Sequence, residues 1–132
     1  MSDFSVHIAE QIRDLMSQGT VRSPPTTVYV AVFDDTDTER STDFQNDRVG
    51  LDAGADWAVT NTSFENGVAV DFGEALVDVN GLEDVALFDA ATGGEELARF
   101  TMNGTPFDIS QGTVLTFNTG DLTFDIIDRT EA

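Results

Sequence analysis

The 132-residue sequence contains no cysteine and no lysine, and each absence removes a class of chemistry. Without cysteine there is no disulfide, no thiolate nucleophile and no cysteine-based zinc site. Without lysine there is no phosphate-binding loop of the Gly-Lys-Ser/Thr kind. The single histidine, His7, cannot form a histidine-rich metal site, and no serine stands in a Gly-x-Ser-x-Gly motif. The sequence therefore argues against an enzyme and gives no reason to expect a cofactor.

Positive charge is scarce. Six arginines face 25 acidic residues, 17 of them aspartate, and the formal net charge is −19. A field of that size destabilises a compact chain by self-repulsion unless salt screens it, and at molar salt the Debye length falls to roughly 3 Å. We therefore predict a salt-adapted protein; an acidic partner-binding module at ordinary salt is the alternative. Binding to nucleic acid is not expected, because its affinity comes mainly from lysine and arginine.

Long apolar runs are also missing, so no segment approaches the length of a membrane span, and the first residues carry no basic region that would indicate a secretory signal. We expect a soluble chain made in the cytoplasm. The length suits a single domain covering residues 1–132.

The N-terminal part has helical periodicity. The spacing of its apolar residues predicts one amphipathic helix over residues 3–18, with Gly19 as a stop and a linker over residues 19–26. The apolar positions of this helix are Phe4, Ile8, Ile12, Leu15 and Met16.

From residue 27 to residue 128 the pattern is that of short strands separated by glycine and asparagine turns. It predicts an antiparallel β-sandwich, jelly-roll-like, of seven or eight strands. The expected strands are 26–33, 56–61, 67–72, 82–88, 95–102, 106–109, 113–117 and 122–127, and the turns include Asn80-Gly81 and Thr92-Gly93-Gly94. Residues 34–47 are polar and acidic, and they predict a long exposed loop. A weakly bound cation at Asp34–Glu39 is an open alternative there, although the segment lacks the glycine and the later glutamate of an EF-hand.

The first strand is apolar on both faces, with Val28, Val30 and Val32 on one side and Tyr29, Ala31 and Phe33 on the other. A single small domain has too little interior to bury two apolar strand faces and the apolar stripe of a helix. We therefore predict a cyclic homo-oligomer, a trimer or pentamer, in which Tyr29 and Phe33, or Ile8 and Ile12 of the helix, lie at subunit contacts.

Several segments together resemble a family of small tailed-phage virion proteins, which are described as tail-fibre-like or minor structural proteins. The most specific is the turn Asp89-Ala90-Ala91-Thr92-Gly93-Gly94, which follows an aliphatic-Phe strand end. The other matching segments, in order, are Tyr29–Phe33, Thr60–Thr62, Val70–Phe72, Gly112–Phe117 and Gly120–Phe124. Where members have a glycine-rich stretch ending in Tyr-Ala-Arg, this chain has Asn46-Asp47-Arg48-Val49.

The resemblance implies a structural protein of a tailed virus, located in the virion. With the charge, we expect a head-exterior decoration or turret subunit of a salt-adapted virus, whose partners are further copies of itself and other virion proteins such as the major capsid protein. A tail, baseplate or fibre protein is the alternative within this class. A sugar-binding β-sandwich is the alternative from another class, although one Trp and one Tyr are a thin supply of exposed aromatic rings.

Overall fold

The computed structural model describes residues 3–4, 10, 12–13, 16–19, 26–60 and 63–125. Those residues form a mainly β chain in which every strand pairing is antiparallel. The elements are β1 (Asp3–Phe4), β2 (Thr27–Asp34), the 3₁₀ helix η1 (Ser41–Asp43), β3 (Val49–Asp52), β4 (Trp57–Val59), β5 (Ser63–Asn66), β6 (Val70–Glu74), β7 (Val79–Phe88), β8 (Glu96–Thr101), β9 (Phe107–Ile109), β10 (Val114–Phe117) and β11 (Thr123–Asp125).

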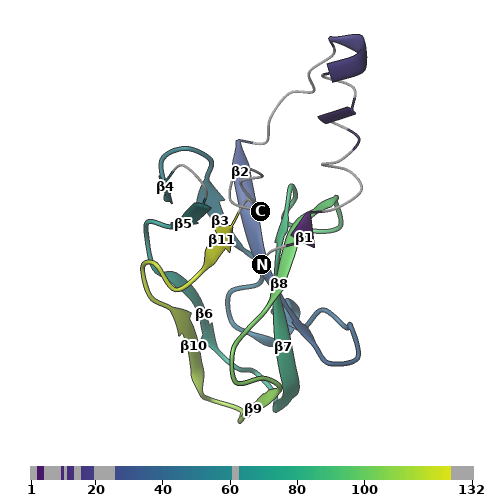
Figure 1. The fold of residues 1–132 in the computed structure, drawn as a ribbon. Coiled ribbons are helices and arrows are strands. Elements are labelled where there is room, and N and C mark those ends of the chain that lie inside the picture. The colour runs from purple at the N-terminus through teal and green to yellow at the C-terminus, as the bar shows by residue number, and fades with distance from the viewer. Residues whose placement is uncertain are drawn as a thin grey trace.

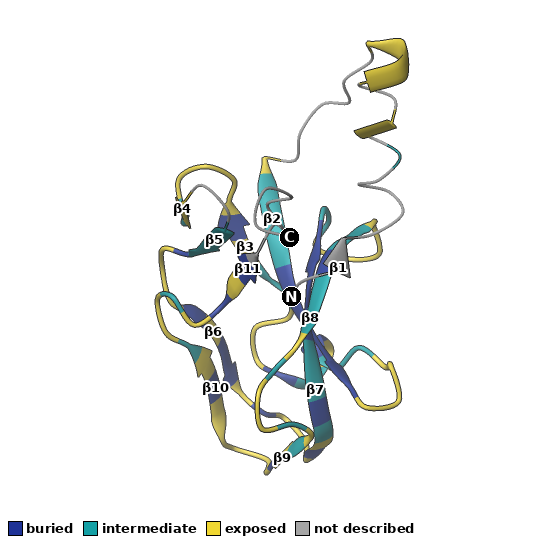
Figure 2. Ribbon diagram, in the orientation of Figure 1, coloured by how far each residue is buried: buried dark blue, intermediate teal, exposed yellow. Residues whose placement is uncertain are grey.

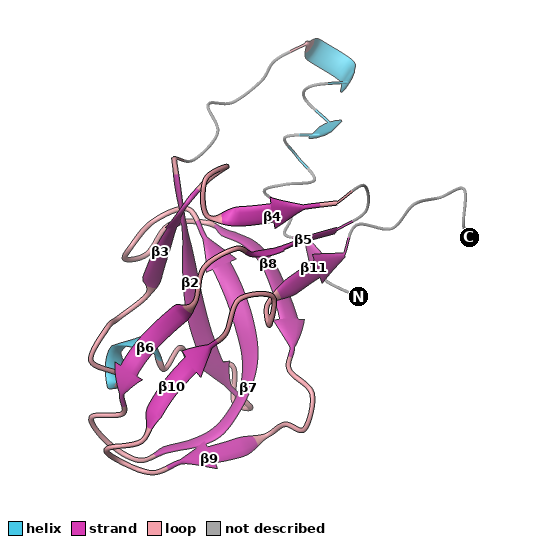
Figure 3. Cartoon of the chain, turned by 90° about the vertical axis from the view of Figure 1, so that its left-hand side faces the viewer, coloured by secondary structure: helices cyan, strands magenta, loops and turns pink. Residues whose placement is uncertain are grey.

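The strands make two layers. The larger sheet has the order β1-β8-β7-β2-β3, with β9 paired to one end of β7. The second layer is made of the pair β10-β6 and the three strands β11-β5-β4, which lie in front of the larger sheet in Figure 3. The predicted antiparallel sandwich is confirmed.

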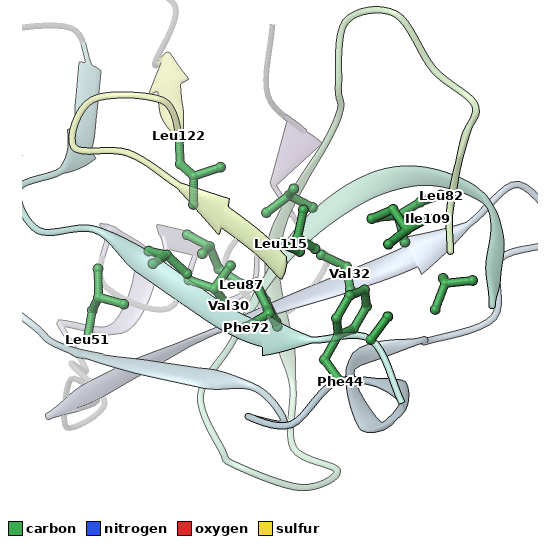
Figure 4. Packing of buried hydrophobic residues seen from close by; sticks show 14 of the residues in the cluster. Val30, Val32, Phe44, Leu51, Phe72, Leu82, Leu87, Ile109, Leu115 and Leu122 are labelled. Carbon is green, nitrogen blue, oxygen red and sulfur yellow. The ribbon is translucent and has the colours of Figure 1, made fainter. Parts of the chain in front are cut away.

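The core fills the space between the layers (Figure 4), as expected for a sandwich whose inner faces alternate with outer ones. Val30 and Val32 of β2 point into it and are fully buried. Ala31 and Phe33 point to the opposite face of the same strand, where they form a second buried cluster with Ala86 and Phe88 of β7. Both faces of β2 are therefore buried over Val30–Phe33.

The N-terminal prediction is wrong at its start. Asp3 and Phe4 form β1, paired to Arg99 and Ala98 of β8, so the unpaired edge of β8 decides their conformation instead of the helical spacing of their neighbours. Residues 10, 12–13 and 16–18 are helical, as predicted, and they stand away from the sandwich (Figure 1). Phe4 thus leaves the predicted stripe, and Ile8 and Leu15 lie outside the described residues.

Two further expectations fail for reasons of tertiary structure. The segment 34–47 is not wholly exposed, because Ser41 and Phe44 are buried and the backbone at Phe44 bridges to Ala75. Asn80-Gly81 is no hairpin turn. Gly81 lies within β7 at φ 74°, where the register with β9 shifts, so this glycine provides a bulge in a continuous strand. The sequence pattern also missed β3 and β5.

Candidate functional site

The outer face of the larger sheet is closed by arginine side chains. Arg48 lies flat over the ring of Phe88, with 3.8 Å from its guanidinium carbon to the ring centroid, and its side chain is 7% exposed. Its Nε and Nη2 donate to the two carboxylate oxygens of Glu39 at 2.8 and 2.7 Å. Its Nη1 donates to the carbonyl oxygens of Ala90 and Gly93 at 2.9 and 2.7 Å. One guanidinium thus joins the loop at Glu39 to the distant turn at Ala90–Gly93.

Those carbonyls belong to the turn Asp89–Gly94, the most specific part of the sequence resemblance, and the structure explains its residue types. Gly93 and Gly94 have φ of 64° and 74°, where side chains are disfavoured. A Cβ on Gly94 would lie 2.5 Å from Asp89 Oδ1. That oxygen accepts a hydrogen bond from the Glu95 amide at 2.8 Å. The turn is therefore shaped as a receptor for the Arg48 guanidinium.

Arg99 repeats the arrangement on the neighbouring ring, 3.9 Å above the centroid of Phe33. It forms ion pairs with Asp37, Asp84 and Glu96. Arg40 is the third arginine between residues 26 and 125, and it pairs with Asp34 and Asp43. All three body arginines are therefore engaged with internal carboxylates.

In the Asp34–Glu39 segment, for which a bound cation was the open alternative, the carboxylates of Asp34, Asp37 and Glu39 are likewise engaged by protein groups. Oδ1 of Asp34 accepts hydrogen bonds from the Thr36 hydroxyl and from the amides of Thr36 and Thr38 at 2.7 to 3.0 Å. Burial acts to raise the pKa of Asp34, but these bonds and Arg40 outweigh it and hold the pKa below its usual value. The hydrogen bonds from Arg48 likewise lower the pKa of Glu39. Within the part of the chain that the structure describes, no three acidic or histidine side chains are grouped to hold a metal ion.

A groove of about 550 Å³ opens between the two layers on the side of β8 and β10. One wall comes from the end of β8 and from β9, and the other from β10 and the turn into β11. Its apolar lining is Phe100, Met102, Phe107, Phe117 and Leu122. Asn103 and Asp121 are polar residues of the lining, and both are exposed.

The groove walls are held by the core. The ring of Phe100 packs edge-on against Phe124 at 5.0 Å, and that of Phe117 packs edge-on against Phe72 at 6.1 Å. Asp121 Oδ2 accepts the Asn118 amide at 2.8 Å, and its other oxygen has no bonded partner among the described residues. The groove is thus a firm apolar surface with polar groups at its edge. Periodicity could not reveal it, because its residues come from four strands.

Of the predicted contact residues, Tyr29 and Phe33 lie together on the outer face of the larger sheet, where Tyr29 packs against the cluster that contains Phe33. Phe33 is 8% exposed and lies under Arg99, so its own chain already covers it. Tyr29 is half-buried and lies over Gly50 of β3, where an added Cβ would be 3.0 Å from its ring. Ile12 is 55% exposed on the helical residues, and Ile8 is outside the described residues. Whether any of them contacts a second copy stays a prediction.

In this small β-sandwich, the three arginines between residues 26 and 125 all pair with carboxylates of the same chain. Over residues 3–125 the chain matches the family described as "Podophage GP4 fiber I protein gp80". The chain belongs to this family and is a phage virion protein, which confirms that part of the resemblance found in the sequence. A search of curated proteins finds no match. No helix among the described residues has the length and apolar character needed to cross a membrane.

Proposed function

We propose that the chain is a structural subunit of a tail fibre, and that it works by assembly and not by catalysis. The observation that carries this is the family match, which covers residues 3–125 and whose description names a fibre protein. The fibre alternative therefore becomes our first choice over the head-exterior decoration or turret role. A virion location with no catalytic residues also agrees with a sequence that has one histidine and no cysteine or lysine.

The architecture suits such a subunit. Arg48 and Arg99 fasten loops across the outer face of the sheet, so that face is finished within one chain. The acidic coat, with 20 acidic residues and three arginines between residues 26 and 125, keeps the domain hydrated when salt screens the repulsion. We include salt adaptation in the proposal on this ground.

Labelling of intact virions tests the location. Antibodies raised against the purified chain and coupled to gold particles would be imaged on virions by electron microscopy. We expect label on the fibres that project from the tail. Label spread over the capsid would instead support the decoration role, and label absent from purified virions would overturn both.

A further inference from the structure

Among the apolar surfaces that the described residues expose, two differ clearly in shape. One is the groove between β8–β9 and β10–β11. The other is the pair Ile12 and Met16 on the helical residues, which are 55% and 82% exposed. Both residues are helical and are four positions apart, which is the spacing of residues on one helix face. Figure 2 shows the helical residues exposed and separate from the sandwich.

Charge decides what can approach the groove. Residues 26–125 carry 20 acids and three arginines, so a contact between two sandwich bodies brings like charges within the roughly 3 Å over which molar salt does not screen them. Residues 1–25 carry three acids and two arginines, and Arg13 lies between Ile12 and Met16. The N-terminal part is thus the nearly neutral part of an acidic protein. An edge that includes Asp121 favours a partner with little negative charge.

From this complementarity we propose that the helical segment of one copy docks in the groove of a neighbouring copy. The Ile12 and Met16 side chains enter the space between Phe107 and Phe117, in the manner of an amphipathic helix laid into an apolar groove. The inference deepens the proposed function, on which it rests, by naming the contact through which subunits join.

The contact joins two different surfaces, so each copy presents one helix and one groove. Such head-to-tail contacts close into a ring or continue as a filament, depending on the rotation between copies. A body-to-body contact through Val59 or Val114, which are 75% and 55% exposed, would bring two acidic coats together and is disfavoured. This contrast supplies the control.

Sedimentation velocity of the full chain at molar salt tests the contact. We expect the wild type to sediment as an oligomer, and Met16→Asp on the helix or Phe107→Asp in the groove to weaken association by about tenfold or more. Val59→Asp introduces the same charge at an exposed apolar site outside both surfaces, and it should leave the oligomer intact. Because Phe107 is half-buried, circular dichroism checks its fold. Asn103→Arg, at the exposed edge, is the second groove variant.

Mixing the variants gives the sharpest result. Met16→Asp has an intact groove, and Phe107→Asp or Asn103→Arg has an intact helix. Each variant alone should be a monomer. An equimolar mixture of one helix variant and one groove variant should form a one-to-one dimer, because the intact helix can dock in the intact groove. A mixture that stays monomeric, or a Val59→Asp variant that dissociates as much as Met16→Asp, would overturn the contact. So would a monomeric wild type, and that result would leave the fibre location, tested on virions, standing.

Discussion

Replacing Arg48 by methionine tests whether the outer face is held by its guanidinium. The variant removes two charge-assisted hydrogen bonds to Glu39 and two to the carbonyls of Ala90 and Gly93. Breaking a buried ion pair from one side costs about 3–5 kcal/mol. The Glu39 side chain is 27% exposed and can regain water, so we expect a loss near the lower end, about 3 kcal/mol.

The measurement is urea unfolding at constant molar salt, followed by the fluorescence of Trp57. This single tryptophan packs edge-on against Phe64 and Phe124 at 5.5 and 6.3 Å. It belongs to the inner core, whereas Arg48 covers Phe88 of the second cluster, so its fluorescence reports global unfolding. Arg48→Lys keeps the charge but not the planar fork, and it should lose about 2 kcal/mol.

Arg40→Met is the matched control. That side chain is 21% exposed and pairs with Asp34 and Asp43, so a loss of about 1 kcal/mol is expected. If Arg48→Met lowers the free energy of unfolding by less than about 1 kcal/mol, or by no more than Arg40→Met does, the reasoning that Arg48 holds the outer face is wrong.

Three further predictions concern salt, pH and the turn. Lowering the salt from about 1 M to about 0.01 M lengthens the Debye length from roughly 3 to 30 Å, so the melting temperature should fall; full stability in dilute buffer would contradict salt adaptation. At molar salt the free energy of unfolding should fall as the pH drops below about 4. Asp34 and Glu39 have lower pKa values in the folded than in the unfolded chain, so their stabilisation is present above the unfolded pKa and is lost as they are protonated. Asp34→Asn should flatten this titration, and an unchanged slope would contradict the assignment. Gly94→Ala should cost about 1–3 kcal/mol more than Gly104→Ala in the same urea titration, because both glycines have φ 74° but only the first lacks room for a Cβ; equal losses would contradict the steric account.

Local patterns in the sequence were enough to predict most of the strands, although not β1, β3 and β5, and to assign the two faces of β2. The alternation in β2 correctly placed Val30 and Val32 in one cluster and Ala31 and Phe33 in another. Sequence alone could not show what covers the second cluster, because the cover is provided by Arg48 and by Arg99, whose binding depends on turns far away in the chain. The two apolar faces of β2 led to the prediction of a neighbouring copy, and within one chain it is Arg99 that lies above Phe33.

The preference for aspartate over glutamate shows the same limit. Composition suggested a solvated coat, but many aspartates are acceptors for loop amides: Asp71 for Gly73, Asp78 for Gln111, and Asp108 for Gly81, at 2.8 to 2.9 Å. A short carboxylate side chain suits these local bonds. The groove was beyond prediction for a similar reason, since its lining is assembled by tertiary pairing.

The ion pairs of Arg40, Arg48 and Arg99 have a consequence for proteolysis. A trypsin-like protease must take an arginine or lysine side chain into its specificity pocket, and the chain has no lysine. Between residues 26 and 125 the only possible sites are the three arginines, each held by carboxylates and none of them more than 23% exposed. The sandwich therefore offers such a protease no cleavable bond until it opens, and the rate at which it is cut measures its opening equilibrium.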